Sequence, residues 1–464
     1  MDRRDFMTKA GMAATGAMFS PAVVKAITLN KKKKKLVLVG TGARGHGFWG
    51  KKLVDRYADY VEFAGICDIN PGRVKFAKDF MGVSCPTFTS FDEMLEKTDP
   101  DLAIVCTVDS THDEFVIKSL EYGIDVITEK PMVTDEHKCQ AIIDAERKSG
   151  KKVIVGFNYR WAPYMTKIKE LLVNNTIGEV TSVDFHWYLN TYHGASYFRR
   201  WHGMTKNSGS LWVHKSTHHF DLVNWWLNSE PEEVMAYGSL EYYGKNGKFR
   251  GKKCRDCDHK SECMFFYDIL KDEAYTKMYV DNEKYDGYIR DNCLFREEID
   301  IYDKMSAQVK YANNVTLNYS LTTYSPFEGW RIAFNGKEGR IEAWDDIPYY
   351  SEMEVDQAEL HAAEMDQSDI EKKEHKPIIV HRIREDYERI IVASSKGGHG
   401  GGDLRMQNKI FMDPNAPDPY GHAAGTRDGA MSCLIGVAAR KSIEEKKAIR
   451  IEDLSEYKPQ AIKS

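Results

Sequence analysis

A group of histidines between Gly209 and Asp221 has the residue types and the spacing of an acid–base site. His214, His218 and Asp221 are four and three positions apart, so on a helix their side chains share one face. A neutral imidazole in this place can take the proton of a carbinol while a cofactor takes the hydride. The segment therefore predicts the general-base chemistry that oxidation of an alcohol needs near neutral pH.

Two other interpretations of these histidines stay open. His214 and His218, at positions i and i+4, can hold a metal ion, although no third ligand stands nearby in the sequence. Histidines that only satisfy hydrogen bonds inside the fold would give the same pattern.

A lysine that follows a short apolar run is the second candidate for chemistry. Glu129-Lys130-Pro131 comes directly after Asp125–Thr128, a predicted strand, and ligands bind at the carboxyl ends of strands in open α/β sheets. A lysine at that edge can hydrogen-bond a substrate hydroxyl and stabilise the developing alkoxide. A surface lysine beside a proline is the competing interpretation of the triplet alone.

A glycine-rich loop follows the first predicted strand. Gly40-Thr-Gly42-Ala43-Arg44-Gly45 has the G-x-G-x-x-G pattern at a junction between a strand and a helix. The first glycine permits a tight turn, the second lets the backbone approach a pyrophosphate, and the third lets the helix pack on the strand. The helix N-terminus then favours the negative charge of the phosphates. The loop predicts a dinucleotide site.

An acidic residue stands where such a site needs one. The second predicted strand ends in Ile66-Cys67-Asp68, and Asp68 lies 23 residues after Gly45. A carboxylate there accepts hydrogen bonds from the adenine ribose and repels a 2′-phosphate, so we expect NAD rather than NADP.

The elements that must position these residues fall into two groups. Short apolar runs alternate with amphipathic segments in the first part of the chain, which is typical of a doubly wound parallel sheet. These runs are Leu36–Val39, Val61–Cys67, Leu102–Thr107, Asp125–Thr128 and Lys152–Phe157.

Later segments alternate with a period of two, as half-buried antiparallel strands do. They begin at Val180, Val234, Ala307, Val315 and Arg331, with turns at Asn313-Asn314 and Gly336–Gly339. We expect a Rossmann domain over 36–160 and an α+β domain over 161–464, built on an open-faced and mostly antiparallel sheet. The segment Asp345 to Glu385 is charged and predicted to be an irregular surface excursion, and Asp428 to Lys446 is predicted to be a late helix.

Four segments together resemble the glucose-fructose oxidoreductase, inositol dehydrogenase and MocA (Gfo/Idh/MocA) superfamily. They are the glycine loop with Asp68, Glu129-Lys130-Pro131, Gly156–Arg160 and the His214–Asp221 segment. The resemblance runs from Leu36 to about Trp344. It implies a Rossmann domain and an open-faced sheet domain with the site between them.

By this resemblance Lys130 and His218 are the catalytic lysine and histidine. His214 stands where the family often has an aspartate, so its part in proton transfer is open. The cofactor contacts implied are Gly40, Gly42, Ala43, Arg44, Gly45, Asp68, Thr107, His112, Glu129, Lys130 and Asn158. The substrate contacts implied are Lys130, Tyr159, Arg160, Lys215, His218, His219 and His399.

Two loops keep alternatives open. The turn from Thr107 to His112 can cap a helix instead of lining the cofactor cleft. His399-Gly-Gly-Gly-Asp403 is similar to loops in NAD-dependent glycosidases of the same superfamily, although a flexible loop has the same composition.

Four cysteines form a separate group near 250–295. Cys254, Cys257, Cys263 and Cys293 can make a closed structural zinc site that fixes an insertion. Disulfides are the main alternative, since the expected destination is oxidising, and iron–sulfur ligation is a weaker one. The other five cysteines are expected to be buried thiols.

The N-terminus predicts export. Arg3-Arg4 precedes a small apolar run from Ala10 to Val24, which is typical of a twin-arginine signal followed by a basic linker to residue 35. Since this route carries folded proteins, we expect a periplasmic protein that keeps its NAD bound.

Bulk composition excludes several classes of protein. The chain has 464 residues with 42% hydrophobic and 29% charged residues, as in a two-domain globular protein. A net charge of −5 gives no basic field for nucleic acid, and no apolar run reaches the roughly 20 residues of a membrane span. The open sheet face suggests a homodimer or homotetramer.

The sequence thus predicts an NAD-dependent oxidoreductase that takes hydride from a sugar ring hydroxyl, such as the 3-hydroxyl of a glycoside. A redox-neutral glycoside hydrolase that works through a 3-keto intermediate is the first alternative, favoured by the His399 loop. A non-catalytic sugar-binding protein is the second.

Overall fold

The computed structural model describes residues 32–347, 356–358, 361, 376–393, 395 and 398–463. The expected twin-arginine signal and most of the linker lie outside the described residues.

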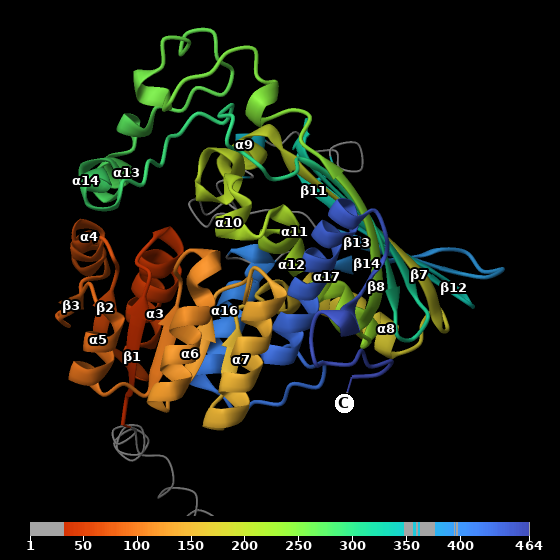
Figure 1. Ribbon diagram of the computed structural model, residues 1–464. Helices are drawn as coiled ribbons and strands as arrows, with labels where there is room; N and C mark the ends of the chain where they lie inside the picture. Colours follow the sequence, from red (N-terminus) through yellow and green to blue (C-terminus); the bar gives the residue numbers. More distant parts are fainter. Residues whose placement is uncertain are drawn as a thin grey trace, which may run out of the picture.

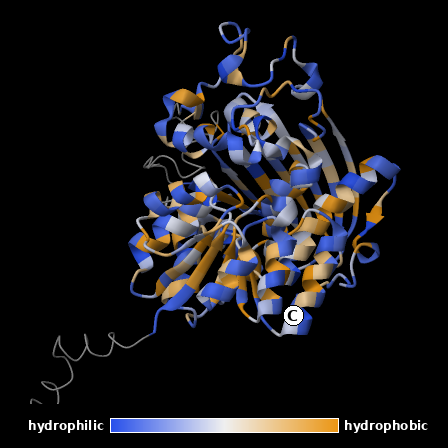
Figure 2. Cartoon of the chain, turned by 60° about the vertical axis from the view of Figure 1, so that its left-hand side comes forward, coloured by the Kyte–Doolittle hydropathy of each residue, from blue (hydrophilic) through white to orange (hydrophobic). Residues whose placement is uncertain are grey.

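The first domain is a parallel six-stranded sheet in the order β3-β2-β1-β4-β5-β6 (Figure 1). Figure 2 shows its apolar strands inside and polar helix faces outside, as the continuous apolar runs predicted. The strands are β1 Lys34–Val39, β2 Val61–Cys67, β3 Thr87–Phe88, β4 Leu102–Val105, β5 Asp125–Thr128 and β6 Val153–Val155. The helices are η1 Arg44–Lys51, α3 Lys52–Tyr57, α4 Pro71–Met81, α5 Phe91–Thr98, α6 His112–Tyr122 and α7 Glu136–Ser149.

The second domain is built on a nine-stranded sheet in the order β14-β13-β12-β11-β7-β10-β9-β8-β15. Its pairs are antiparallel except β10 with β7, which run parallel. The strands are β7 Val180–Asn190, β8 Pro231–Ser239, β9 Lys304–Tyr311, β10 Thr316–Ser325, β11 Gly329–Gly336, β12 Gly339–Asp345, β13 Lys376–Arg382, β14 Glu388–Val392 and β15 Ile449–Arg450.

Helices cover one face of this sheet and separate it from the first domain. Every second side chain of β9 and β10 is buried under them, because successive residues of a strand point to opposite faces. The helices are α8 Pro163–Val173, α9 Thr191–Arg199, α10 Thr205–Ser208, α11 Leu211–His214, α12 Ser216–Leu227 and α17 Thr426–Glu445. Helix α12 is buried on nearly all sides, since it packs between α8, α17 and the sheet.

These elements confirm the predicted fold class. One prediction was wrong: the described end of the segment from Asp345 to Glu385 is the strand β13, not an irregular excursion, and it pairs with β12. Its alternation of buried and exposed residues covers too few positions to stand out from the charged stretch before it. None of the helices described is long and apolar enough to cross a bilayer.

The insertion between β8 and β9 is a long arm, residues 240–303, that reaches back to the first domain. Figure 1 shows α13 (Glu273–Met278) and α14 (Glu283–Asp286) of the arm beside α4. The carbonyl of Asn282 accepts a hydrogen bond from the side-chain amide of Asn70 (2.9 Å), and Asp286 forms an ion pair with Arg73. The arm therefore bridges the two domains next to Asp68.

A C-terminal segment also returns to the first domain. Residues 398–412, with η10 His399–Gly401, α16 Gly402–Gln407 and η11 Asn408–Met412, follow the strands of the second sheet. Met406 and Phe411 nevertheless belong to the core beneath Trp49. The glycine-rich loop before α16 is thereby held at the domain junction.

Contact between the arm and α4 can be tested at Gly72. A β-carbon there would lie 1.8 Å from Oδ1 of Asn282, whose amide is held by the carbonyls of Lys277 (2.8 Å) and Met278 (3.2 Å). We expect Gly72→Ala to release the arm and to speed tryptic cleavage at Lys277. The matched variant Gly47→Ala, with no atom within 4 Å of its new β-carbon, should leave cleavage unchanged. Equal rates in both variants would contradict the docked arm.

Candidate functional site

The glycine loop has the shape that a dinucleotide requires. Gly40 has φ +86°, and a β-carbon on it would lie 2.5 Å from the backbone of Cys106. A β-carbon on Gly45 would lie 2.0 Å from the Gly40 carbonyl, so neither position accepts a larger residue. Gly42, in contrast, faces open space with no heavy atom within 4 Å. The loop thus leaves its exposed backbone where a pyrophosphate would bind, and the residues present fit NAD.

Asp68 directly follows β2, and its carboxylate is well anchored. Oδ2 accepts from the Thr41 amide (2.8 Å), and Oδ1 accepts from the Asn70 amide (2.9 Å). Arg73 lies between Asp68 and Asp286 of the arm. Two carboxylates against one guanidinium disfavour a further phosphate here, consistent with the expectation of NAD.

Glu129 connects the glycine loop to the strand that carries Lys130. Its Oε1 accepts from Arg44 Nε (2.6 Å) and from Trp49 Nε1 (2.7 Å). Burial pushes the pKa of Glu129 up, but Arg44 and Lys130 outweigh burial and the pKa is lowered. Glu129 is therefore a buried carboxylate anion that orders its neighbours.

Lys130 points toward the helices of the second domain. Its Nζ donates to the backbone carbonyl of His214 (3.1 Å). Burial lowers the pKa of Lys130, while Tyr197, Asp109 and Glu129 oppose that shift. The ammonium thus sits in a largely dry place, where a hydrogen bond from it to a substrate oxygen is strong.

His214 is paired with an aspartate from the first domain. Its Nδ1 lies 2.5 Å from Oδ2 of Asp109, in the turn η2 (Asp109–Thr111) after β4. Burial raises the pKa of Asp109 well above its usual range and lowers that of His214 well below its own. The two groups therefore share one proton between them. The family that this chain resembles often has an aspartate at position 214. Here position 214 is a histidine, and the carboxylate beside it comes from Asp109.

His218 has the environment of a general base. It is buried at the start of α12, with its ring 4.6 Å from the Tyr159 ring, and among the described residues its Nδ1 has no hydrogen-bond partner. Burial, and then the charge of Lys130, lower the pKa of His218 well below its ordinary value. The imidazole is thus neutral at neutral pH and able to accept a proton.

The C-terminal loop brings His399 to the same place. The His399 ring lies 5.2 Å from Tyr159 and 6.3 Å from His218. Its Nδ1 is 3.0 Å from Oδ2 of Asp403, and Oδ1 of Asp403 accepts from the Asn158 amide (2.6 Å). Asp403 thus links His399 and Asn158, and His399 lies beside His218.

Aromatic rings form one wall beside the histidines. The Lys215 ammonium lies 5.2 Å from the Trp187 ring and 5.9 Å from the Tyr159 ring. Lys215 separates α11 from α12, so the expected single helix from His214 to Asp221 is two helices that meet there.

Three of the predicted contact residues have hydrogen-bond or ring partners inside the fold. Arg160 makes two hydrogen bonds to Asp221 (2.8 and 2.5 Å) and one to Asp428 (2.9 Å). His219 is fully buried in the sheet domain and stacks on Trp187 at 3.9 Å.

His112 is the third of these residues. Its ring nitrogens lie 2.8 Å from the Pro131 carbonyl and 3.2 Å from the Thr107 carbonyl. It positions the turn after Lys130 and the turn that contains Thr107.

Sequence reasoning missed Asp109, Tyr197 and His202. The Tyr197 and His202 rings lie 5.2 and 4.2 Å from the His214 ring. Asp109 stands in the same polar turn as His112, which was a usable signal. Tyr197 and His202 carry no local motif, so only the fold brings them to the site.

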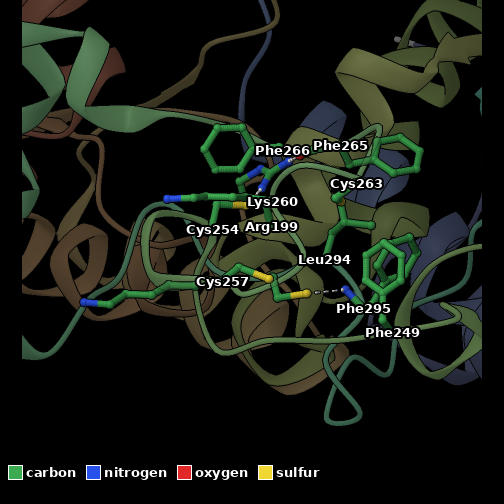
Figure 3. A pocket seen from close by; sticks show the side chains of 12 residues that line it. Arg199, Phe249, Cys254, Cys257, Lys260, Cys263, Phe265, Phe266, Leu294 and Phe295 are labelled. Carbon is green, nitrogen blue, oxygen red and sulfur yellow. Dashed lines mark hydrogen bonds between the residues drawn. The ribbon is translucent and has the colours of Figure 1, made fainter.

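The four arm cysteines surround a common pocket near Arg199 and Phe295 (Figure 3). Cys254 Sγ accepts from Arg199 Nη1 (2.7 Å), and Cys293 Sγ accepts from the Phe295 amide (3.4 Å). All four are free thiols, and no group of three or more His, Cys, Asp or Glu in the described part of the chain has the geometry to hold a metal. The structure therefore does not support the predicted zinc site or the alternative disulfides.

Comparisons with known proteins agree with this geometry. A family model described as "Oxidoreductase family, NAD-binding Rossmann fold" matches residues 34–157. A second, described as "Oxidoreductase family, C-terminal alpha/beta domain", matches residues 169–451.

Relatives include the Bacillus subtilis (strain 168) oxidoreductase YteT, 38% identical over 91% of this chain and 98% of its own. An inositol 2-dehydrogenase/D-chiro-inositol 3-dehydrogenase of Lactiplantibacillus plantarum is 25% identical over 50% of this chain and 67% of its own. Levoglucosan dehydrogenase in complex with NADH and levoglucosan shares the fold with a TM-score of 0.63 at 15% identity, covering 90% of this chain and all of that one.

The ion pair of Arg160 gives a stability test. Arg160→Met keeps most of the side-chain volume but leaves Asp221 buried without its cation, and burial already raises the pKa of Asp221 to about 6. We expect the free energy of unfolding to fall by about 3–5 kcal/mol, measured as a lower midpoint in urea. The control Lys167→Met breaks a half-exposed pair with Glu170 and should cost at most about 1 kcal/mol. Similar losses in both variants would contradict the structural role of Arg160.

Proposed function

The chain belongs to the Gfo/Idh/MocA oxidoreductase family, and on that premise we propose that it oxidises a ring hydroxyl of a sugar, such as the 3-hydroxyl of a glycoside. One observation carries the proposal. A neutral, buried imidazole at His218 and the Lys130 ammonium converge where the glycine loop, β5 and the second domain meet.

The reaction needs three groups, of which the chain supplies two. His218 accepts the proton of the substrate hydroxyl as the C–H bond breaks. Lys130 donates a hydrogen bond to the same oxygen and stabilises its growing negative charge before the carbonyl forms. Bound NAD supplies the hydride acceptor.

The pair of His214 and Asp109 holds this arrangement in place. The His214 carbonyl accepts the Lys130 hydrogen bond, and its ring is fixed by Asp109 at 2.5 Å. A lysine fixed from two domains is positioned only when the domains are packed together. Substrate enclosure and catalysis are thereby coupled.

A redox-neutral glycoside hydrolase is the second candidate. The observation that favours it is the position of His399, whose ring lies 6.3 Å from His218 and whose Nδ1 contacts Asp403. A second acid–base group at the site suits elimination of an aglycone from a 3-keto intermediate, followed by return of the hydride.

Export and assembly are further parts of the proposal. Arg3-Arg4 and the apolar run after them support twin-arginine export to the periplasm, where no NAD pool would replace lost cofactor. The arm contact beside Asp68 suits such retention. The uncovered face of the second sheet suits a homodimer or homotetramer.

A panel of glycosides tests the proposed reaction. Purified protein incubated without added NAD should form keto-glycoside and bound NADH in equal amounts. Catalytic release of aglycone without net reduction would instead establish the hydrolase. Protein that carries no NAD and changes no sugar would support the non-catalytic alternative.

Lys130→Ala and His218→Ala should each lower kcat/KM by at least about 100-fold while NAD stays bound. The exposed control His137→Ala should keep full activity. Near-normal turnover in either site variant would show that the chemistry lies elsewhere.

The pH dependence follows from burial of His218. Because its pKa lies well below the usual value of about 6.5, the imidazole keeps its lone pair as the pH falls through that value. We expect kcat/KM to hold from pH 8 to about 6.5 and to fall only at lower pH. An acid limb with its midpoint near that of an ordinary histidine would contradict a buried base.

A further inference from the structure

Two arginines near the site are buried without an acidic partner among the residues that the structure describes. Arg200 and Arg290 are 8% and 9% exposed. In the described part of the chain, no carboxylate lies within 4.0 Å of either guanidinium, whereas Arg160 and Arg73 each contact two. Buried charges in proteins are normally paired, so these two arginines could bind an anion that the described residues do not provide.

The residues around Arg200 and Arg290 replace only part of the hydrogen bonding with water that the two guanidinium groups lose on burial. Arg290 lies between the rings of Tyr275 and Tyr279, at 5.1 and 5.0 Å from the ring centroids. Arg200 lies 5.5 Å from the Tyr197 ring and donates from Nε to the Ser196 carbonyl (2.9 Å). The Tyr288 side chain also interacts with the Arg290 guanidinium. A guanidinium has five N–H donors, and neither aromatic faces nor a neutral hydroxyl accept them as strongly as an oxyanion does.

The two arginines are close to each other. After burial, the charge of Arg290 is the largest cause of the lowered pKa of Arg200. Arg290 belongs to the arm, and Arg200 follows α9 of the second domain. Two fixed cations from different segments thus face one region.

That region adjoins the catalytic groups. Tyr197, against which Arg200 packs, has its ring 5.2 Å from the His214 ring. The His214 carbonyl in turn accepts the hydrogen bond from Lys130. Arg200 is also close enough to lower the pKa values of His214 and His202.

The surroundings of the two arginines indicate whether they bind a phosphate of the cofactor or an oxyanion of the substrate. Tyr279 contacts both Arg290, at 5.0 Å from the ring centroid, and the glycine loop, where its hydroxyl makes a hydrogen bond with the Ala43 backbone. Arg200 packs on Tyr197, whose ring lies 5.2 Å from the His214 ring, so this arginine lies on the side of the catalytic groups. An oxyanion on the substrate fits this place better than the phosphates of the cofactor.

We propose that Arg200 and Arg290 form a subsite for the carboxylate of an acidic sugar, so that the substrate is a uronate glycoside. The inference rests on the proposed function, since it names the substrate class of the same site. A carboxylate held by both guanidinium groups neutralises two buried charges and orients the sugar ring toward Lys130 and His218.

This subsite gives selectivity by a simple mechanism. A neutral hexoside leaves both guanidinium groups without an anion, which a site built around a charged partner does not tolerate. We expect kcat/KM for a methyl glycosiduronate to exceed that for the matching neutral methyl glycoside by at least about 100-fold.

The experiment compares matched pairs of methyl glycosides and methyl glycosiduronates, with the 6-phosphates as a third arm. The readouts are bound NADH by absorbance, NAD content after purification, and the thermal shift caused by each sugar. Arg200→Gln and Arg290→Gln should abolish the preference for the uronate and its thermal shift, with NAD content unchanged. The exposed arm variant Arg250→Gln should behave as wild type.

Each other outcome has a defined meaning. If wild type oxidises neutral and acidic sugars equally well, the subsite is wrong while the proposed function stands. If no sugar of any kind is oxidised, the proposed function fails. A preference for the 6-phosphates, or loss of NAD in the variants with the uronate preference intact, also overturns the carboxylate assignment. If the variants do not fold, the thermal shifts of wild type with the paired sugars decide the question.

Discussion

The buried carboxylate of Glu129 is the interaction on which the site depends. Arg44 of the glycine loop and Trp49 of the following helix both donate to it, and the next residue is Lys130. Arg44 also lies 3.6 Å from Asp403, which fixes His399 and Asn158. One cluster of charges therefore connects the glycine loop, the strand end that carries Lys130 and a loop some 270 residues after Lys130. Removing Glu129 would leave the partly buried Arg44 with Asp403 as its acidic partner in the described residues, and Trp49 Nε1 without its acceptor, so the effect would reach all three segments.

Burial also sets the protonation states that the chemistry needs. His218 and His214 are kept neutral, and Lys130 loses part of its preference for the charged form. Because His214 shares a proton with Asp109 across the domain boundary, the protonation of the site is linked to the packing of the two domains. The arm reinforces that packing through Asn282 and Asp286.

The sequence predicts those features that have a local cause. The glycine loop, Asp68 and the strand before Lys130 follow from short patterns, and the alternation of β7 to β11 follows from one buried sheet face. Features that depend on contacts between distant segments could not be predicted from the sequence. Asp109 meets His214 across 105 residues, and Arg200 meets Arg290 only through the path of the arm. Arg160 and His219 have reactive side chains but partners inside the fold, which no local pattern reveals. The cysteine spacing suggested zinc, yet the spacing of thiols along a chain does not fix the directions in which their sulfurs point.

The transfer of hydrogen from sugar to bound cofactor is the central claim, and isotope labelling tests it most directly. A glycoside or glycosiduronate deuterated at its ring carbons is mixed with the purified protein, and the reaction is quenched within one turnover. The mass of the released nicotinamide cofactor is then measured by mass spectrometry. The account predicts NADH that carries one deuterium in wild type and none in Lys130→Ala or His218→Ala. Product formed by wild type while the cofactor stays unlabelled would contradict it.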